Sequence, residues 1–106
     1  MSETPNLNYI NELAAGDLGI KTKLINIMKN EFPEERAEFA IYMQSSEYNK
    51  ASEQVHKLKH KINILGLQKG YVLAKNFEND LKNENTSLND RFRKLLNTIE
   101  NYLNTL

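Results

Sequence analysis

The sequence of 106 residues contains no cysteine, two prolines and four glycines. Without cysteine the chain has no disulfide framework, no thiol nucleophile and no thiolate ligand for a metal. Because proline and glycine interrupt helices, their scarcity leaves long stretches free to be helical, and the hydrophobic residues, 40% of the total, are scattered at helical spacing. No segment alternates apolar and polar residues over a useful length. We therefore expect helices and no sheet.

An excess of charge of one sign and long hydrophobic runs are also missing. The 14 basic and 14 acidic side chains balance, so the net charge gives no reason to expect nucleic acid or an anionic membrane as a partner. No apolar stretch approaches the roughly 20 residues that span a bilayer. The opening residues MSETPN have neither the basic start nor the apolar run of a signal peptide. The expected protein is soluble and cytoplasmic.

Apolar residues at intervals of three and four predict four substantial amphipathic helices and a short one before them. Pro33 either kinks one long helix or starts a second, and the sequence leaves both open. Short connections favour an up-and-down antiparallel four-helix bundle with a short additional N-terminal helix. We expect one domain over residues 1–106, with a flexible tail at about 1–5. The stripes are Leu7, Ile10 and Leu13; Leu24, Ile27, Met28 and Phe32, continued by Phe39, Ile41, Tyr42 and Met43; Val55, Leu58, Ile62 and Leu65; Tyr71, Ala74, Phe77 and Leu81; and Leu88, Phe92, Leu95, Ile99, Tyr102 and Leu106.

Polar residues before these stripes indicate where helices begin. Asp17 and Ser46 are candidate N-caps. In the turn "NENTSLND", Ser87 followed three residues later by Asp90 resembles a capping box.

The stretch "VHKLKHKINILG", residues 55–66, contains both histidines of the chain, four residues apart. If the stripe that begins at Val55 points inward, Lys59, His60 and Asn63 point outward, and His56 lies on the outer flank with them. A solvated imidazole is largely neutral and nucleophilic at neutral pH, and a neighbouring ammonium would stabilise an anion bound to its nitrogen. This arrangement suits reversible acceptance of a phosphoryl group, although a histidine on a lysine-rich face is more often plain solvated surface.

The order of residues in this stretch resembles the signature of histidine-containing phosphotransfer (HPt) domains, in which His-x-Leu-Lys-Gly is followed after five residues by Gly. His56, Leu58, Lys59 and Gly66 occupy the matching places. The preceding "SSEYNKASEQV" and the following "LAKNFEND" resemble the adjoining parts of the family, and Glu78 stands where a Glu or Gln commonly faces the active histidine. The resemblance extends from about residue 17 to the end.

The resemblance implies that Nε2 of His56 accepts the phosphoryl group. Glu78 would accept a hydrogen bond from Nδ1–H, which fixes the tautomer and supports positive charge on the ring. Lys59 would pair with the phosphoryl oxygens. The implied binding surface adds His60, Asn63, Gly66 and Lys82.

The implied partners are the receiver domain of a response regulator and a hybrid histidine kinase. The sequence has no glycine-rich phosphate loop, no Walker-type lysine and no aspartate cluster for magnesium. We therefore expect a monomeric phosphocarrier that needs no cofactor of its own, and Mg²⁺ on the partner receiver domain. Tyr48 and Leu67 are candidate docking residues.

One residue departs from the family pattern and leaves other functions open. The family has glycine directly after the lysine, where this chain has His60. A non-phosphorylated helical interaction module that docks a receiver or kinase is therefore an alternative. A metal-binding helical bundle is another, since Glu53-x-x-His56 matches the Glu-x-x-His unit of di-iron bundles, and His56 with His60 is a common i, i+4 ligand pair. That unit is needed on two helices, and because this chain has no further histidine for it, we assign no metal ligands.

Overall fold

The computed structural model describes residues 3–106, and all regular structure in this range is α-helical, as the sequence predicts. The described part of the chain forms five helices, which are α1 (Asn8–Ala14), α2 (Leu18–Gln44), α3 (Tyr48–Ile64), α4 (Gln68–Lys82) and α5 (Asn89–Leu103). No helix in this range is both long enough and apolar enough to cross a membrane.

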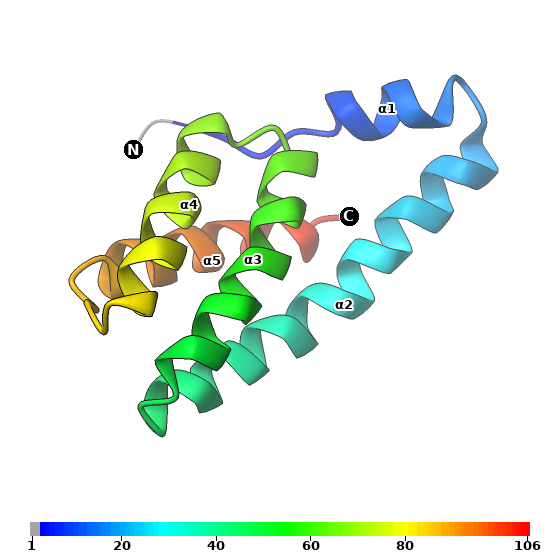
Figure 1. Cartoon of the computed structure of the whole chain (residues 1–106). Coiled ribbons are helices and arrows are strands. Elements are labelled where there is room, and N and C mark those ends of the chain that lie inside the picture. Colours follow the sequence, from blue (N-terminus) through cyan, green and yellow to red (C-terminus); the bar gives the residue numbers. More distant parts are fainter. Residues whose placement is uncertain (1–2) are drawn as a thin grey trace.

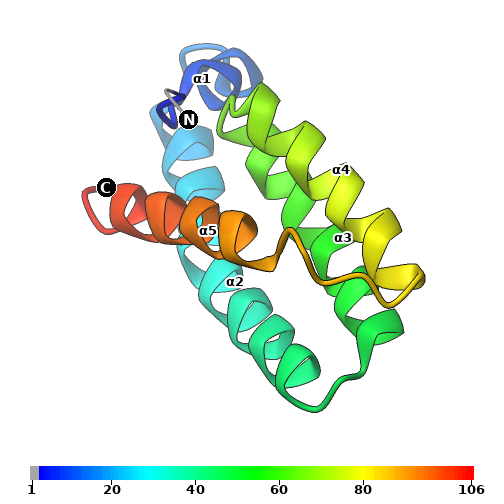
Figure 2. The same ribbon diagram turned by 90° about the vertical axis from the view of Figure 1, so that its left-hand side faces the viewer.

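The helices α2, α3 and α4 lie side by side and run in alternating directions, because short turns join them (Figures 1 and 2). Helix α3 packs against both α2 and α4, whereas α1 packs against the first part of α2. Helix α5 contacts α4 and α2 but lies across them rather than alongside (Figure 2). The central position of α3 is what sets the surroundings of the two histidines.

Pro33 lies inside α2, which continues through it as one helix. A proline in a helix removes one backbone hydrogen bond and crowds the preceding turn. The buried side chains of Met28 and Phe32 before it, and of Phe39 after it, hold both halves against the core. Packing therefore outweighs the local preference of proline.

The N-cap predicted at Asp17 is confirmed. Its Oδ1 accepts hydrogen bonds from the backbone N–H groups of Gly19, at 2.8 Å, and Ile20, at 3.1 Å. These are two of the N–H groups that a helix start leaves without a partner. The polar side chain thus fixes the point where α2 begins.

The other two predicted caps are wrong. Ser46 has a φ of 56°, in the left-handed region, whereas an N-cap residue needs an extended backbone, and Glu47 precedes α3 instead. Helix α5 begins at Asn89 after Leu88, without a side-chain cap, so Ser87 lies too early for the capping box. The backbone N–H of Ser87 instead donates to Asn85 Oδ1 at 3.0 Å.

The segment before α1 is held against the globule from Glu3 onward. Pro5 is buried, and the backbone N–H of Asn6 donates to the carbonyl oxygen of Leu65 at 2.9 Å. The Glu3 carboxylate accepts the backbone N–H groups of Lys69, at 2.7 Å, and Gly70, at 3.0 Å. Of the tail expected at about residues 1–5, residues 1 and 2 lie outside the described residues, and the Glu3 carboxylate satisfies two N–H groups in the first turn of α4.

The core lies where the inner faces of α2, α3, α4 and α5 meet. The stripe predicted for α3 is confirmed, since all four of its apolar residues are fully buried. Phe39, Phe77 and Phe92 bring α2, α4 and α5 together, with ring centroids 5.2–6.1 Å apart. Gly70 allows α4 to approach α5 closely, because a Cβ at this position would lie 3.1 Å from the side chain of Leu95 on α5.

Candidate functional site

The position of α3 against its two neighbours is set by polar contacts as well as by the apolar core. The hydroxyl of Ser52 donates to the carbonyl oxygen of Glu78 at 2.9 Å, which fixes the register of α3 against α4. On the opposite flank, Lys61 Nζ donates to Glu31 and Glu35 of α2, both at 2.9 Å. Helix α3 is therefore held from both sides.

His56 lies at the surface of α3 beside α4. Its side chain is 51% exposed, and its Nδ1 lies 3.1 Å from Oε2 and 3.3 Å from Oε1 of Glu78. The Glu78 side chain is only 13% exposed. The imidazole is thus open to solvent on one edge and bound to a nearly buried carboxylate on the other.

Lys59 is not on the outer surface, contrary to the outward orientation expected for it. The residue is 9% exposed, and its Nζ lies 3.0 Å from Glu78 Oε1 and 5.7 Å from the ring centroid of Tyr71. A long lysine stem packs readily on apolar surface, and a buried ammonium requires a counter-charge. Glu78 supplies that charge, so Lys59 lies in the contact between α3 and α4.

Glu78 is the common partner of the charged groups at this site. Burial alone would raise the pKa of its carboxyl, but the hydrogen bond and charge of Lys59, followed by those of His56, outweigh burial and hold the pKa below its ordinary value. Lys82, one turn along α4, lies 3.9 Å from Glu78 Oε2. Glu78 is therefore ionised at neutral pH.

The charge on Glu78 decides which nitrogen of His56 is free. A carboxylate only accepts hydrogen bonds, so Nδ1 of His56 must carry the proton that is donated to it. The lone pair of the neutral ring is then on Nε2, at the exposed edge. The arrangement presents one nucleophilic nitrogen, with a carboxylate behind the ring that would stabilise positive charge on it.

His60 is the neighbour of that free nitrogen. Its Nε2 lies 3.4 Å from Nε2 of His56, close enough to donate a hydrogen bond to it in the tautomer that carries the proton on Nε2, and the two rings are perpendicular with centroids 4.9 Å apart. A helix places residues four apart on the same face, and here the two side chains converge. Any group that binds to His56 Nε2 will therefore also meet His60.

The structure does not bring Asn63 or Gly66 to this point. Asn63 is exposed two turns further along α3. Gly66 follows the end of the helix with a φ of 77°, and a Cβ there would lie 2.5 Å from Asn6 Nδ2. A glycine is required at this position because the turn needs a positive φ and the N-terminal segment packs against it. The structure thus unites His56, Lys59, His60, Glu78 and Lys82.

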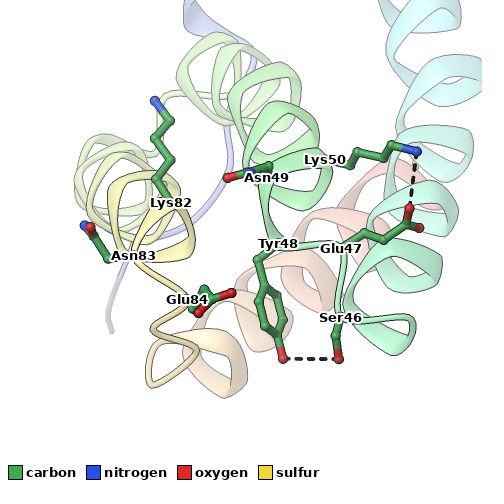
Figure 3. A pocket seen from close by; sticks show the side chains of 8 residues that line it. All are labelled: Ser46, Glu47, Tyr48, Asn49, Lys50, Lys82, Asn83 and Glu84. Carbon is green, nitrogen blue, oxygen red and sulfur yellow. Dashed lines mark hydrogen bonds and ion pairs between the residues drawn. The ribbon is translucent and has the colours of Figure 1, made fainter.

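The two candidate docking residues have different surroundings. Leu67 is 1% exposed, so its assignment to a docking surface is wrong: the residue is part of the core. Tyr48 is partly buried and lines a cleft of about 460 Å³ between the start of α3 and the end of α4 (Figure 3). Lys82 lines the same cleft. The remaining lining residues are polar, namely Ser46, Glu47, Asn49, Lys50, Asn83 and Glu84.

Sequence reasoning missed the residues that position the site. Ser52 lies three residues before Val55, on the buried side of α3. A serine in an apolar stripe needs a hydrogen-bond partner, and that pattern would have indicated an interhelical contact. Nothing local indicates that Lys61 pairs with Glu31 and Glu35, because those partners are on another helix.

Among residues 3–106, no group of three or more histidine, cysteine or acidic side chains is placed to hold a metal ion. Comparisons of this chain with models of known protein families, with curated proteins and with solved structures gave no match.

Proposed function

We propose that this chain is a phosphocarrier of the HPt type, which accepts a phosphoryl group on Nε2 of His56 and passes it on. The observation behind this proposal is the cluster in which Glu78 binds both His56 Nδ1 and Lys59 Nζ, at 3.1 and 3.0 Å. It leaves Nε2 of His56 without a bond to Glu78, at the surface and facing His60, and places charges of both signs beside the ring. The signature around His56 supports the same function.

In the proposed reaction, the donor is the acyl phosphate of an aspartate in a receiver domain. Nε2 attacks phosphorus, the new P–N bond forms as the P–O bond to the aspartate breaks, and the electron pair of that bond leaves with the carboxylate. The ring becomes positively charged, and Glu78 stabilises this charge through Nδ1–H. The return reaction reverses each step. Catalysis of such a transfer depends mainly on positioning and charge neutralisation, and Mg²⁺ on the receiver would supply part of the latter.

Lys59 and Lys82 would contribute to the proposed transfer in different ways. An ammonium has three donors, and the ion pair with Glu78 uses one of those of Lys59. The others would attract the phosphoryl oxygens. The side chain of Lys82 is 58% exposed and lies on the other edge of Glu78, so it would add longer-range positive potential and contact the partner.

The remaining parts of the proposal concern the fold and the partners. Helices α2, α3, α4 and α5 contact one another in a closed cycle, which supports a four-helix bundle with one crossed helix. As proposed, the chain is a cytoplasmic monomer without a cofactor of its own, and it exchanges phosphoryl groups with a receiver domain and a hybrid histidine kinase.

Incubation with a phosphorylated receiver domain tests this function. The wild-type chain should acquire an acid-labile, base-stable label, and His56→Gln should acquire none, because glutamine lacks the nucleophilic nitrogen. His60→Gln is the matched control, since it changes the other histidine of the same face, and it should retain the label. A label that persists in His56→Gln and is lost in His60→Gln would disprove the assignment of the acceptor.

A helical interaction module that docks a receiver or kinase without accepting phosphate is a second candidate, favoured by one observation. The His60 ring lies 3.4 Å from the nitrogen that would accept the phosphoryl group, where the family pattern has no side chain. Binding of a receiver domain with equal affinity by the wild type and by His56→Gln, without any label in the wild type, would favour this function.

A further inference from the structure

The two imidazoles converge with a separation that fits coordination of one metal ion. A tetrahedral Zn²⁺ with Zn–N bonds of about 2.0–2.1 Å holds two nitrogens about 3.3 Å apart. The Nε2 atoms of His56 and His60 are 3.4 Å apart, and both residues are exposed. Rotation of the two exposed rings about their side-chain bonds would direct both lone pairs at one ion at this separation.

The contact between His56 and Glu78 prepares the first of these ligands. Histidines that bind metals usually donate the other ring N–H to a carboxylate, which fixes the tautomer and increases the basicity of the ligating nitrogen. Glu78 accepts from Nδ1 of His56 in this way at 3.1 Å. The nitrogen that remains, Nε2, is the one that faces His60.

The surrounding charges decide which ions fit. Lys59 and Lys82 lie 3.0 and 3.9 Å from Glu78, so the carboxylate behind His56 is already compensated. An ion held mainly by charge, such as Mg²⁺ or Ca²⁺, would find neither free carboxylates nor the oxygen ligands that it prefers. Ions that form strong bonds to imidazole nitrogen, namely Zn²⁺, Cu²⁺ and Ni²⁺, do not depend on that charge.

We propose that His56 and His60 form a two-nitrogen chelate for a divalent transition-metal ion of the Zn²⁺, Cu²⁺ and Ni²⁺ class. The two Nε2 atoms supply two ligands, and water completes the coordination shell. Each neutral ring donates the lone pair of Nε2 and keeps its proton on Nδ1, so that binding displaces water from the ion and breaks no covalent bond.

The chelate has a consequence that rests on the proposed function. The lone pair of His56 Nε2 cannot bind a metal ion and phosphorus at once. Bound Zn²⁺ would therefore block acceptance of a phosphoryl group, and phosphorylated His56 would no longer form the chelate. His60, which stands in place of the glycine of the family pattern, is the residue that would make the carrier sensitive to these metals.

Titration of the untagged, unphosphorylated protein with Zn²⁺ tests the chelate by itself. Calorimetry should show one site, and His56→Gln or His60→Gln should each weaken the affinity by about tenfold or more, since each removes one of two ligands. Lys57→Gln, an exposed change on the same helix, should leave the affinity unchanged. In nitrogen NMR of the wild type, the Nε2 resonances of both histidines should shift together.

The result that would overturn the chelate is a His60→Gln affinity equal to that of the wild type, or a shift of only one histidine. The consequence for phosphoryl transfer is tested separately. Zn²⁺ should inhibit labelling of the wild type much more than labelling of His60→Gln, and a chelator should restore it. If no label forms even in the presence of the chelator, the proposed function fails while the metal affinity stands.

Discussion

Glu78 is the residue at which the charges of the site meet. It binds Lys59 and His56 directly and has Lys82 within 3.9 Å, although its own side chain is 13% exposed. A carboxylate in this position has to stay ionised, since neither the buried ammonium nor the correct imidazole tautomer would be stable without it. Its contribution to folding and to the site can be separated by substitution.

We expect Glu78→Gln to lower the free energy of unfolding by about 1–3 kcal/mol, because Lys59 loses its counter-charge inside the contact between α3 and α4. Urea denaturation measures this change. The same variant should also populate both imidazole tautomers of His56, which nitrogen NMR distinguishes. Glu53→Gln, at an exposed position of α3, is the control and should change neither measurement.

The difference in unfolding free energy between wild type and Glu78→Gln depends on pH, and the direction of the pKa shift of Glu78 sets the sign of this dependence. The pKa of Glu78 in the folded chain lies below its ordinary value of 4.5. Its stabilisation is therefore complete above the ordinary pKa and is lost as the pH falls through the lower, folded value. The difference in unfolding free energy between wild type and Glu78→Gln should shrink in that acidic range. A difference that is constant down to the acid transition would contradict the ion pair.

The position of His60 beside His56 leads to a prediction about the rate of phosphoryl transfer. The ring of His60 lies 3.4 Å from Nε2 of His56, so under the proposed function His60→Ala should speed phosphoryl transfer from a receiver several-fold in the presence of a metal chelator. His60→Gly should do the same with a lower free energy of unfolding, since glycine inside a helix costs about 0.5–1 kcal/mol relative to alanine. Slower transfer in both variants would show that His60 assists the reaction.

At the scale of the helices, Lys61 joins α3 to α2. Its side chain is 10% exposed, and burial would lower the pKa of Lys61, but the hydrogen bonds and charges of Glu31 and Glu35 raise it above the ordinary value. We expect Lys61→Met to lower the free energy of unfolding by about 1–3 kcal/mol in urea denaturation. Lys57→Met, which changes an exposed residue of the same helix, should stay within about 0.5 kcal/mol.

The stabilisation by Lys61 is lost at high pH, whereas the stabilisation by Glu78 is lost at low pH. A raised folded pKa means that the stabilisation by Lys61 is fully present below its ordinary pKa of 10.5 and is lost as the pH rises through the higher, folded value. The advantage of wild type over Lys61→Met should therefore persist through neutral and mildly alkaline pH. Its loss near neutrality would mean that the pair does not form.

The sequence predicts those features of a helix that nearby residues determine, and it does not predict those that contacts with other helices determine. The stripe of Val55, Leu58 and Ile62 follows from helical periodicity alone, and the cap at Asp17 follows from its own side chain. The inward position of Lys59 does not, because periodicity defines a face but not which neighbouring helix covers its flank. The same holds for Ser46, whose left-handed backbone is imposed by the turn to α3.

At the scale of the molecule, three phenylalanines join helices that are distant in sequence. Phe92 on α5 contacts Phe39 on α2 and Phe77 on α4, and all three are buried. Periodicity predicted that each of them is buried, but not that α5 crosses the other helices, since this direction depends on how side chains from several helices fit together. The crossing therefore became visible only in the structure.

We expect Phe92→Ala to lower the free energy of unfolding by about 3–5 kcal/mol, because it leaves a cavity where α2, α4 and α5 meet. Denaturation followed by circular dichroism measures this loss. Ile41→Ala removes an apolar side chain that is 59% exposed and should cost about 0.5 kcal/mol or less. Equal effects of the two substitutions would rule out the three-ring cluster as the centre of the core.

The cap that Glu3 provides has a practical consequence for anyone who trims the chain. Helix α4 has no side-chain cap of its own, and the Glu3 carboxylate accepts two of its first N–H groups from more than sixty residues upstream. Deleting the first six residues would free the start of the helix that bears Glu78 and remove the backbone hydrogen bond from Asn6 to Leu65. Shortened versions made to simplify a spectrum or a crystal would thus loosen the support behind His56.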